Sequence, residues 1–420
     1  MPPVFLRYNS GKKAGDSMVI GIIGAGASGM AAALAASENE NVQVILFERQ
    51  ARVGRKLQAT GNGRCNLTNI HAAHGGYHGE EAAFADFAIS QMPPENTLAW
   101  FRSMGLYTVT EETGRVYPYS DQANSVVDVL RLALSRPNIS LLTGFAVQKI
   151  RREAEGFVVC GETEYFCHKL IIACGGLAGT KLGGSMSGYK LLAKFGHKST
   201  RLRPTLVQLK CDWAGVTALK GVRANCRAQI LRDGSLFAES TGEIQFTDYG
   251  LSGPVVFEVS RDVCCGPGVW IAQLDFLPAW EQDELFRELQ RRQCAGIPVE
   301  ELLTGILHNR LGRVVTRYAG IRDSRQIDTL TPEELSAVAA SVKCFEISLT
   351  EPMGMDSAQV TAGGVLTRDF DSQTMESKLV PGLYACGEVL DIDGDCGGYN
   401  LQWAWSSGCL AGTSAGKGQV

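Results

Sequence analysis

Apolar and polar positions follow a strand-then-helix pattern at the start of the chain. Residues 18–36 read "MVIGIIGAGASGMAAALAA", a short β-branched apolar run, a glycine turn and an alanine-rich stretch. Such a run predicts a strand buried on both faces of a parallel sheet, and the alanines predict a helix. A second apolar run, "VQVILFE", occupies residues 42–48. Together they predict one βαβ unit.

Helical and extended patterns then alternate up to about residue 200. Three segments have helical periodicity: "FADFAIS" at 84–90, "ENTLAWFRSMG" at 95–105 and "NSVVDVLRLALS" at 124–135. Residues 140–176 read as a succession of short strands that ends in the apolar "KLIIACGG". This order predicts an α/β domain.

From about Arg201 the pattern changes. Four stretches alternate like antiparallel strands: residues 205–213, 225–234, 235–240 and 243–250. Three stretches are amphipathic and predict helices: residues 279–293, 299–312 and 331–342, the last with a Thr-Pro-Glu-Glu start signal. A further apolar strand, "GLYACGE", and a helix over 400–416 close the chain.

One α/β domain is therefore predicted to be split by an insertion. We expect its two parts at 18–200 and 350–420, a β-rich insertion at 201–278 and 342–349, and a small helical domain at 279–341. The basic, pattern-free residues 1–17 lack the apolar core of a secretory signal, and we expect a disordered leader there.

Composition narrows the function classes. The 420 residues carry a net charge of −4, which argues against a dedicated nucleic-acid or anionic-membrane binder. No apolar run reaches the roughly 18 residues that span a bilayer. The 13 cysteines are scattered without any C-x-x-C, which excludes a disulfide framework, a zinc ribbon and a vicinal redox dithiol. We expect a cytoplasmic protein with reduced thiols.

The turn at residues 24–29 carries the first chemical signal, G-x-G-x-x-G. Its first glycine permits a tight turn, the second lets backbone approach a pyrophosphate, and the third lets the helix pack on the strand. Glu48 ends the next strand at the position of a ribose-binding acid. An acid there suits FAD or NAD and repels a 2′-phosphate. The turn predicts dinucleotide contacts from Gly24, Gly26, Ala27, Ser28 and Gly29.

Two C-terminal features favour FAD over NAD. Gly387 and Glu388 end an apolar strand, where the carboxylate can accept from ribityl hydroxyls. Gly397-Gly398 precedes a helix whose first N–H groups can face a flavin pyrimidine edge and stabilise its anion on reduction. Those N–H groups belong to Tyr399, Asn400 and Leu401.

The stretch "GRKLQATGNGRCNLTN" directly after Glu48 is rich in glycine and hydrogen-bond donors. We expect it to clamp the flavin, because its glycines allow close backbone approach. The remaining predicted contacts are Arg49, Lys56, Asn62, Gly63, Arg64, Cys65, Asn66, Val147, Ala173, Gly175 and Gly176. Substituting both Asn66 and Arg64 by alanine is predicted to weaken flavin retention.

The order of these blocks resembles the BaiN-like (YhiN-type) family of NAD(P)/FAD-dependent oxidoreductases, also labelled the aminoacetone oxidase family. "GNGRCNLTN" and "GGYNLQWAWSSG" carry the resemblance, which covers nearly the whole chain after Met18. It implies a Rossmann-like FAD domain of glutathione-reductase type, an inserted β-barrel-like domain, a small helical domain and non-covalent FAD. One activity in the family is reduction of double bonds conjugated to the ketone of oxo-bile acids. The chain departs from the family pattern at "GGSMSGY" and at Asp248.

Candidates for acid–base chemistry are few. His71, His74 and His78 share a glycine-rich loop, but no i, i+4 pairing supports a metal, and we expect a solvated loop. Tyr117 and Tyr399 are weak candidates for a proton donor. No metal is predicted.

The sequence thus predicts an FAD-dependent oxidoreductase, with NAD(P)H as electron donor and an unsaturated or carbonyl-bearing small molecule as acceptor. Two alternatives stay open: an oxidase that uses oxygen, and a flavin-bound RNA-modification accessory protein. We expect no nucleic-acid or membrane partner, and a monomer or small homo-oligomer.

Overall fold

The computed structural model describes residues 17–293, 296–322 and 324–417. The predicted leader therefore lies outside the described residues except for Ser17. The chain divides into two compact units. Unit 1 combines the residues up to Arg203 with those from Gln359 onward, and unit 2 comprises Pro204–Ala358.

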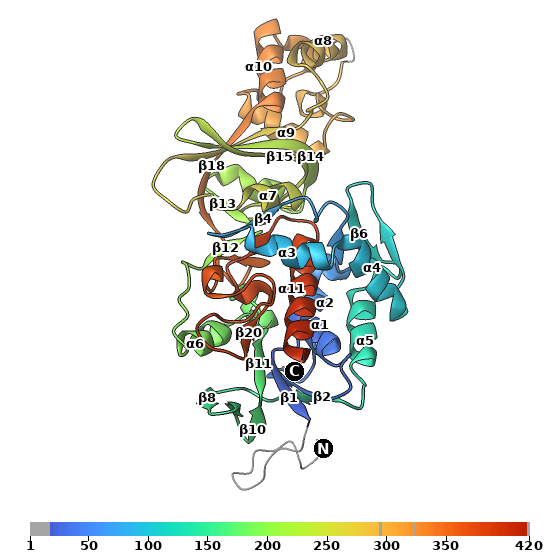
Figure 1. The fold of residues 1–420 in the computed structure, drawn as a ribbon. Coiled ribbons are helices and arrows are strands. Elements are labelled where there is room, and N and C mark those ends of the chain that lie inside the picture. Colours follow the sequence, from blue (N-terminus) through green and yellow to red (C-terminus); the bar gives the residue numbers. More distant parts are fainter. Residues whose placement is uncertain (1–16, 294–295, 323, 418–420) are drawn as a thin grey trace. The chain divides into compact units, whose positions relative to one another are not determined.

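A parallel five-stranded sheet forms the centre of unit 1 (Figure 1). Its strand order is β20-β11-β1-β2-β7, and every neighbouring pair is parallel. The bounds are β1 Met18–Ile23, β2 Val42–Glu48, β7 Ile139–Thr143, β11 Lys169–Ile172 and β20 Leu383–Ala385. Since β1 and β11 are buried almost throughout, their continuous apolar runs match a sheet that is covered on both faces.

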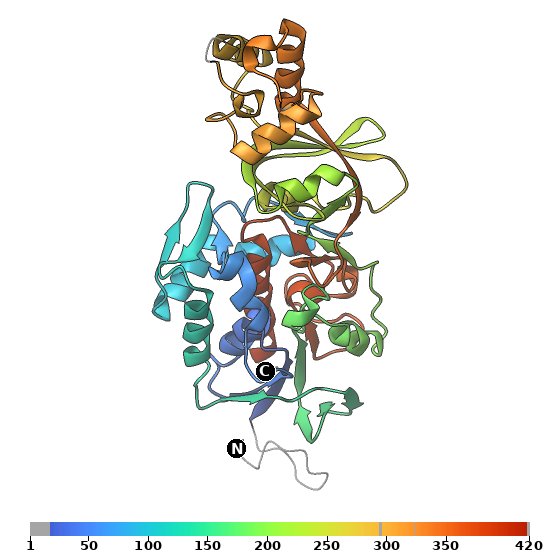
Figure 2. The same ribbon diagram turned by 180° about the vertical axis from the view of Figure 1, so that it is seen from behind.

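Two helices distant in sequence pack together beside this sheet, as both opposite views show (Figures 1 and 2). They are α1, Ala27–Ala36, and α11, Tyr399–Gly416. A Cβ on Gly408 would overlap the carbonyl oxygen of Ser28, and a Cβ on Gly412 would overlap that of Ala32. Glycines four residues apart thus let the two backbones touch. The helices run parallel, so both begin at the carboxyl edge of the sheet.

Smaller elements complete unit 1. Its helices are α2 Arg55–Ala59, α3 Phe84–Gln91, α4 Pro94–Ser103, α5 Ala123–Ala133 and α6 Ser187–Ala193. Its further strands are β3 Thr68–Asn69, β4 Tyr77–His78, β5 Thr108–Thr110, β6 Arg115–Pro118, β8 Lys149–Glu153, β9 Gly156–Cys160, β10 Glu164–Cys167, β19 Val360–Ala362 and β21 Asp393–Gly394. The strand β12, Arg203–Thr205, begins at the last residue of the first part of unit 1.

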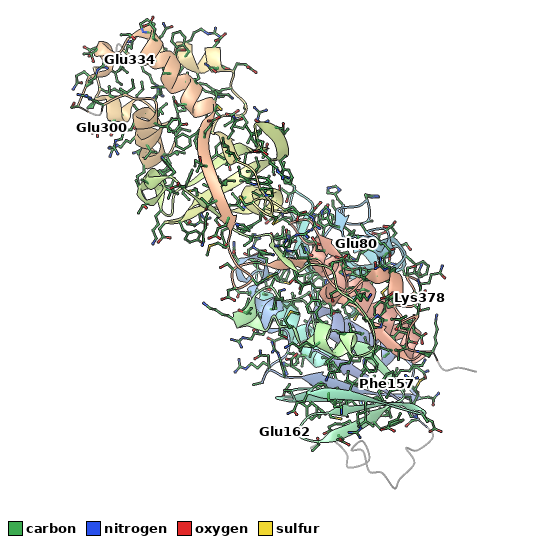
Figure 3. The ribbon with its side chains drawn as sticks, turned by 90° about the vertical axis from the view of Figure 1, so that its left-hand side faces the viewer. Glu80, Phe157, Glu162, Glu300, Glu334 and Lys378 are labelled. Carbon is green, nitrogen blue, oxygen red and sulfur yellow. The ribbon has the colours of Figure 1, made fainter. Side chains whose placement is uncertain are left out.

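Unit 2 contains a closed antiparallel barrel and a group of helices. The barrel order is β13-β16-β15-β14-β17-β18. The strands are β13 Leu209–Cys211, β14 Arg223–Arg232, β15 Ser235–Phe246, β16 Gly250–Ser252, β17 Trp270–Asp275 and β18 Phe345–Pro352. The helices are α7 Pro254–Val259, α8 Gln282–Arg292, α9 Asn309–Tyr318 and α10 Pro332–Lys343. Glu300 and Glu334, labelled in Figure 3, lie in the helical part.

The predicted fold class is confirmed: a Rossmann-like α/β unit carries a β-barrel and a helical insertion. The start signal of the helix at 331–342 is also confirmed, because Thr331 and Glu334 form a reciprocal capping box at α10.

Two sequence-based predictions in unit 2 are wrong. The segment 299–312 is not one helix: a 3-10 turn covers Val299–Glu301, and α9 begins only at Asn309. Gly305, with φ of 81°, interrupts the helical path between them. The predicted strands 235–240 and 243–250 form one long strand over most of their length, β15, because Thr241 and Gly242 stay extended and pair with β14.

None of the twelve cysteines in the described part of the chain forms a disulfide. Among the helices that the structure describes, none is both long enough and apolar enough to cross a bilayer.

Candidate functional site

The glycine turn between β1 and α1 adopts the tight conformation that the sequence predicts. Gly24 has φ of 107°, and its N–H donates to Phe47 O at 2.8 Å. A Cβ on Gly24 would collide with Ala173 O, and a Cβ on Gly29 would overlap Gly24 O. These two glycines are therefore required by packing within the protein itself.

Gly26 differs from both, because a Cβ there would meet no protein atom within 4 Å. Gly63 and Gly175 are open in the same way. Gly26 begins α1, whose first N–H groups and dipole favour an anion. An open glycine at a helix N-terminus is what a bound pyrophosphate needs for close approach.

Glu48 ends β2 beside this turn. Its Oε2 accepts from Ala25 N at 2.9 Å, and its Oε1 accepts from Gln50 N at 2.8 Å. These bonds fix the carboxylate at the sheet edge, and each oxygen keeps lone pairs for a ribose hydroxyl. The segment that contains Val147 passes close by, since Phe145 N donates to Glu48 O at 2.9 Å.

The motif that ends in "CNLTN" is hydrogen-bonded to the N-terminal part of α11 and to the glycine just before it. Asn69 Nδ2 donates to Gly397 O at 3.0 Å, and Trp405 Nε1 donates to Leu67 O at 2.9 Å. A Cβ on Gly398 would overlap Thr68 C and O, so only glycine fits there. Trp403 and Trp405 are fully buried and belong to the core of this unit.

The register of α1 against α11 sets the length of the site. Gly408 lies against Ser28, so the nine residues from Tyr399 to Ser407 extend α11 by about 14 Å beyond the first turn of α1. Two helix N-termini thus point to the carboxyl edge, one near the glycine turn and one farther along. This spacing suits a dinucleotide with its pyrophosphate at α1 and its ring near α11.

Four residues of the motif have left-handed backbone: Gly61, Asn62, Gly63 and Cys65 have φ of 56°, 57°, 86° and 63°. Glycine and asparagine tolerate this conformation better than other residues, which explains the composition of the turn. The Cys65 thiol is buried, and burial raises its pKa to about 12. It therefore stays protonated at neutral pH, as expected of a structural cysteine.

Asn66 has an unsatisfied acceptor. The residue is 8% exposed, and its Oδ1 has no hydrogen-bond partner among the described residues. A buried carbonyl oxygen without a partner costs free energy unless a ligand or water supplies the donor.

Arg64 and Lys56 are engaged by carboxylates. Arg64 Nη2 bonds Glu111 Oε1 at 2.9 Å, its Nε bonds Asp121, and its guanidinium lies 3.9 Å from the centroid of the Tyr117 ring. The Asp121 hydrogen bond is the main cause of a raised Arg64 pKa. Lys56 Nζ pairs with Glu388 Oε2 at 2.8 Å.

The Lys56–Glu388 pair continues into a network that the sequence did not indicate. Thr361 N donates to Glu388 Oε1 at 2.8 Å, and Thr361 Oγ1 accepts from Leu177 N and Ala178 N, both at 2.9 Å. A Cβ on Gly176 would approach both Thr361 and Glu388, which explains that glycine. Nothing in the local sequence around Thr361 marks it.

The other predicted contacts lie at the same edge. Ala173 follows β11 beside Gly24, Gly387 follows β20 beside Ser28, and Ala27 opens α1. Arg49 bonds Gly183 O through Nη2. Asn400 binds the backbone of Gly394 through both side-chain atoms, at 2.8 and 2.7 Å, and Leu401 packs against the core.

The tyrosine candidates differ in surroundings. Tyr117 is buried beneath Arg64, and burial is the main cause that raises its pKa. Tyr399 opens α11, and its ring meets that of Tyr77 edge to face at 6.0 Å. His78 bonds Asp395, a pair that sequence reasoning missed because 317 residues separate them. In the described residues no group of three or more His, Cys, Asp or Glu could hold a metal ion.

The residues present fit FAD. The open Gly26 and Gly175 and the fixed carboxylate of Glu48 lie at the carboxyl ends of three neighbouring parallel strands. The unsatisfied Asn66 Oδ1 belongs to the segment that packs on α11 through Leu67. In unit 2, Asp248, where the sequence departs from the family pattern, pairs with Lys220 at 2.6 Å, which lowers its pKa.

Comparison with known proteins identifies the family of the chain. The family described as "HI0933-like protein Rossmann domain" matches residues 18–414. The 3-dehydro-bile acid delta(4,6)-reductase of Clostridium scindens is 39% identical over 405 residues, 95% of this chain and 99% of the relative. The ribosomal RNA dihydrouridine synthase of Escherichia coli is 30% identical over 389 residues, 92% of this chain and 95% of the relative.

A solved structure supports the fold. The 3-ketosteroid delta1-dehydrogenase of Sterolibacterium denitrificans matches with a TM-score of 0.52 at 11% identity, covering 96% of this chain and 99% of that one. The family resemblance drawn from the sequence motifs is confirmed by these matches. The chain therefore belongs to the HI0933-like family, and it is a flavoprotein oxidoreductase.

Proposed function

We propose that the protein binds one FAD non-covalently along the edge from Gly26 to the N-terminus of α11. We propose further that it uses NAD(P)H to reduce a carbon–carbon double bond conjugated to a carbonyl in a small molecule. Bound FAD would carry the hydride between donor and acceptor. The 39% identity to a named reductase over 99% of its length is the observation that carries the reductase proposal.

The chain's own residues would hold and orient the cofactor. The N–H groups that begin α1 would hold the pyrophosphate, and Glu48 would accept from the adenosine ribose. Asn66 Oδ1 would accept from a donor of the flavin, which would satisfy it. The N-terminus of α11 favours negative charge at the ring that it faces.

Lys56 and Glu388 are proposed to act as one unit at this edge. Their ion pair is partly buried, with 31% and 19% of the side chains exposed. Lys56 keeps two further N–H donors for a phosphate, and Glu388 keeps lone pairs for ribityl hydroxyls.

A second candidate function is reduction of a uracil base in RNA, favoured by the ribosomal RNA dihydrouridine synthases of Escherichia coli and Haemophilus influenzae at 30% and 29% identity. A uracil ring also has a double bond conjugated to a carbonyl, so the chemistry is related. Charge favours the small molecule: unit 2 carries 15 Lys and Arg against 21 Asp and Glu, a net formal charge of −6. Such a surface repels phosphates.

We also propose a cytoplasmic location, supported by the lack of disulfides among the described cysteines. The protein is proposed to act as a monomer or small homo-oligomer without a membrane partner.

Anaerobic rapid mixing tests the proposal. The yellow protein is mixed with NADH or NADPH, and the reduced protein is then mixed with a 4-en-3-one steroid, with air, or with unmodified ribosomal RNA. Bleaching by a pyridine nucleotide followed by fast reoxidation with the enone supports the reductase.

Three other results would each overturn it. Failure of both nucleotides to bleach the flavin removes the NAD(P)H step. Fast reoxidation by air with peroxide release, and none by enones, establishes the oxidase. Dihydrouridine in the RNA, with no enone turnover, establishes the RNA function.

A further inference from the structure

We propose that His78, oriented by Asp395, delivers the proton that completes reduction of the double bond. This inference rests on the proposed reductase function and adds a proton donor to it.

The His78 ring is held at one nitrogen. Its Nε2 lies 2.6 Å from Asp395 Oδ1. The two residues come from paired segments, because β4 runs antiparallel to β21 with His78 opposite Asp393 and Tyr77 opposite Gly394. Asp395 N also donates to Gly76 O at 2.9 Å, so the backbone on both sides of the pair is fixed.

The other ring nitrogen is available. In the part of the chain that the structure describes, Asp395 is the one hydrogen-bond partner of the His78 ring, and 37% of the side chain is exposed. With Nε2 held by the carboxylate, Nδ1 is the ring nitrogen from which a proton can be transferred to a substrate. The same arrangement allows the ring to regain its proton from water.

The pair stands where the reacting end of the cofactor is expected. Asn400, in the first turn of α11, bonds Gly394 O at 2.7 Å and Asp395 O at 3.3 Å. That turn lies about 14 Å beyond the first turn of α1, at the far end of the proposed dinucleotide site. In Figure 3, Glu80 in the loop after β4 lies at the opposite end of unit 1 from Phe157 and Glu162.

Tyr77, next to His78 in the chain, is less suited to give a proton. Burial raises the pKa of Tyr77 far above neutrality, and its Oη is buried without a partner among the described residues. The Tyr77 and Tyr399 rings pack edge to face beside the pair and form an apolar wall. Besides Asp395, Asp393 lies opposite His78 in the β4–β21 pair, and Glu80, two residues after His78, donates its backbone N–H to Asp391.

The step balances as follows. A hydride derived from NAD(P)H adds to the β-carbon, and the electron pair of the double bond moves to the carbonyl as an enolate. His78 Nδ1–H gives its proton to the α-carbon of that enolate. The neutral ring keeps its Nε2–H on Asp395 and is reprotonated from solvent, so the sum is one hydride and one proton added across the bond.

The test compares His78→Asn, Asp395→Asn and the control His74→Asn, which changes an exposed histidine of the same loop. Anaerobic stopped-flow separates flavin reduction by NAD(P)H from reoxidation by a 4-en-3-one steroid. In all three variants we expect the rate of flavin reduction by NAD(P)H to stay within about twofold of the wild-type rate. Reoxidation should slow by 10²- to 10⁴-fold in His78→Asn, the range of general acid catalysis. The reoxidation rate should fall roughly tenfold in Asp395→Asn and stay at the wild-type value in His74→Asn.

A binding measurement supplies a readout without turnover. A phenol mimics the enolate, and its affinity can be measured by calorimetry. We expect His78→Asn to bind the phenol at least about tenfold more weakly than the wild type or His74→Asn does. Unchanged reoxidation and unchanged phenol binding in His78→Asn would overturn the role of His78 alone. A wild-type protein whose reduced flavin no enone reoxidises would instead overturn the proposed function, and this inference with it.

Discussion

Gly26 and Gly29 lie three residues apart in one turn, yet a side chain would meet different surroundings at each. A Cβ on Gly29 enters the backbone of Gly24, whereas a Cβ on Gly26 enters open space. The protein needs Gly29 in order to fold, and it needs Gly26 only if something binds there.

We predict that Gly29→Ala lowers the free energy of unfolding by at least about 3 kcal/mol, because the overlap forces the turn apart. Gly26→Ala should leave the urea midpoint of the apoprotein unchanged and lower the affinity for FAD at least about tenfold. Urea denaturation and FAD fluorescence titration measure the two effects. Wild-type FAD affinity in Gly26→Ala would contradict the proposal that the pyrophosphate binds at this turn.

Asn66 allows the clamp to be tested with one residue instead of two. Since its Oδ1 has no partner in the described protein, Asn66→Ala should cost little stability and still weaken flavin retention about tenfold. Arg64 is held by Glu111 and Asp121, so its removal acts on the loop as well as on any ligand. Flavin retained after gel filtration gives the readout, and Asn124→Ala, at an exposed amide bonded to Gln58, is the control. Equal retention in the two alanine variants would argue against the Asn66 contact.

A buried histidine gives the protein a pH-dependent stability. His197 is 3% exposed, bonds Ser377 Oγ at 3.0 Å and stacks on Phe370. Burial lowers its pKa below the unfolded value of about 6.5, so the unfolded state takes up a proton first as the pH falls. The contribution of this group to stability is therefore complete above about pH 6.5 and is lost below it.

Thermal unfolding of the wild-type protein between about pH 7.5 and 5.5 should show this loss, and His197→Gln should flatten the curve over the same window. His74→Gln, at an exposed position, should keep the wild-type slope. An unchanged slope in His197→Gln would assign the pH dependence to other groups.

At the scale of elements, the packing of α1 on α11 sets the length of the proposed cofactor site. The two helices touch through Gly408 and Gly412, so any larger residue must push them apart. We predict that Gly412→Ala lowers the free energy of unfolding by about 1–3 kcal/mol, whereas Thr413→Ala, at an exposed position of the same helix, changes it by less than about 0.5 kcal/mol. Urea denaturation measures both effects. Equal urea midpoints for Gly412→Ala and Thr413→Ala would contradict the close contact between the two helix backbones.

The sequence predicts elements well where one local pattern determines them. The βαβ unit, the roles of Gly24 and Gly29 and the capping box of α10 all follow from short-range signals. The segment 299–312 misled because Val299, Leu302 and Leu303 have helical spacing, while Gly305 ends the path after one turn. Apolar spacing of three and four positions does not distinguish a short turn from a helix.

Across the whole molecule, the contacts that sequence reasoning missed are the long-range ones. Lys56 meets Glu388, and His78 meets Asp395, more than 300 residues away in each case. A single sequence indicates which residue types a site contains. It does not indicate which charged side chains pair, because those pairs depend on how the fold brings distant segments together. Arg49, Lys56 and Arg64 were predicted to contact the flavin. The structure pairs Lys56 and Arg64 with carboxylates, whereas Arg49 bonds the carbonyl of Gly183.

The unequal charge of the two units bears on the substrate at this scale. Since unit 2 carries a net formal charge of −6, we expect an uncharged or cationic small molecule to be favoured over RNA. In competition, a large excess of ribosomal RNA should leave enone turnover within about twofold. Strong inhibition that weakens as salt is raised would point to an RNA site.

The central claim is that unit 1 holds one FAD between the glycine turn and the N-terminus of α11. Titration of the apoprotein with FAD, FMN and NAD, followed by quenching of flavin fluorescence and by calorimetry, tests it most directly. The account predicts one FAD per chain, bound at least tenfold more tightly than FMN, which lacks the adenosine that Glu48 would contact, and more tightly than NAD. No binding of FAD, or equal binding of FAD and FMN, would contradict it.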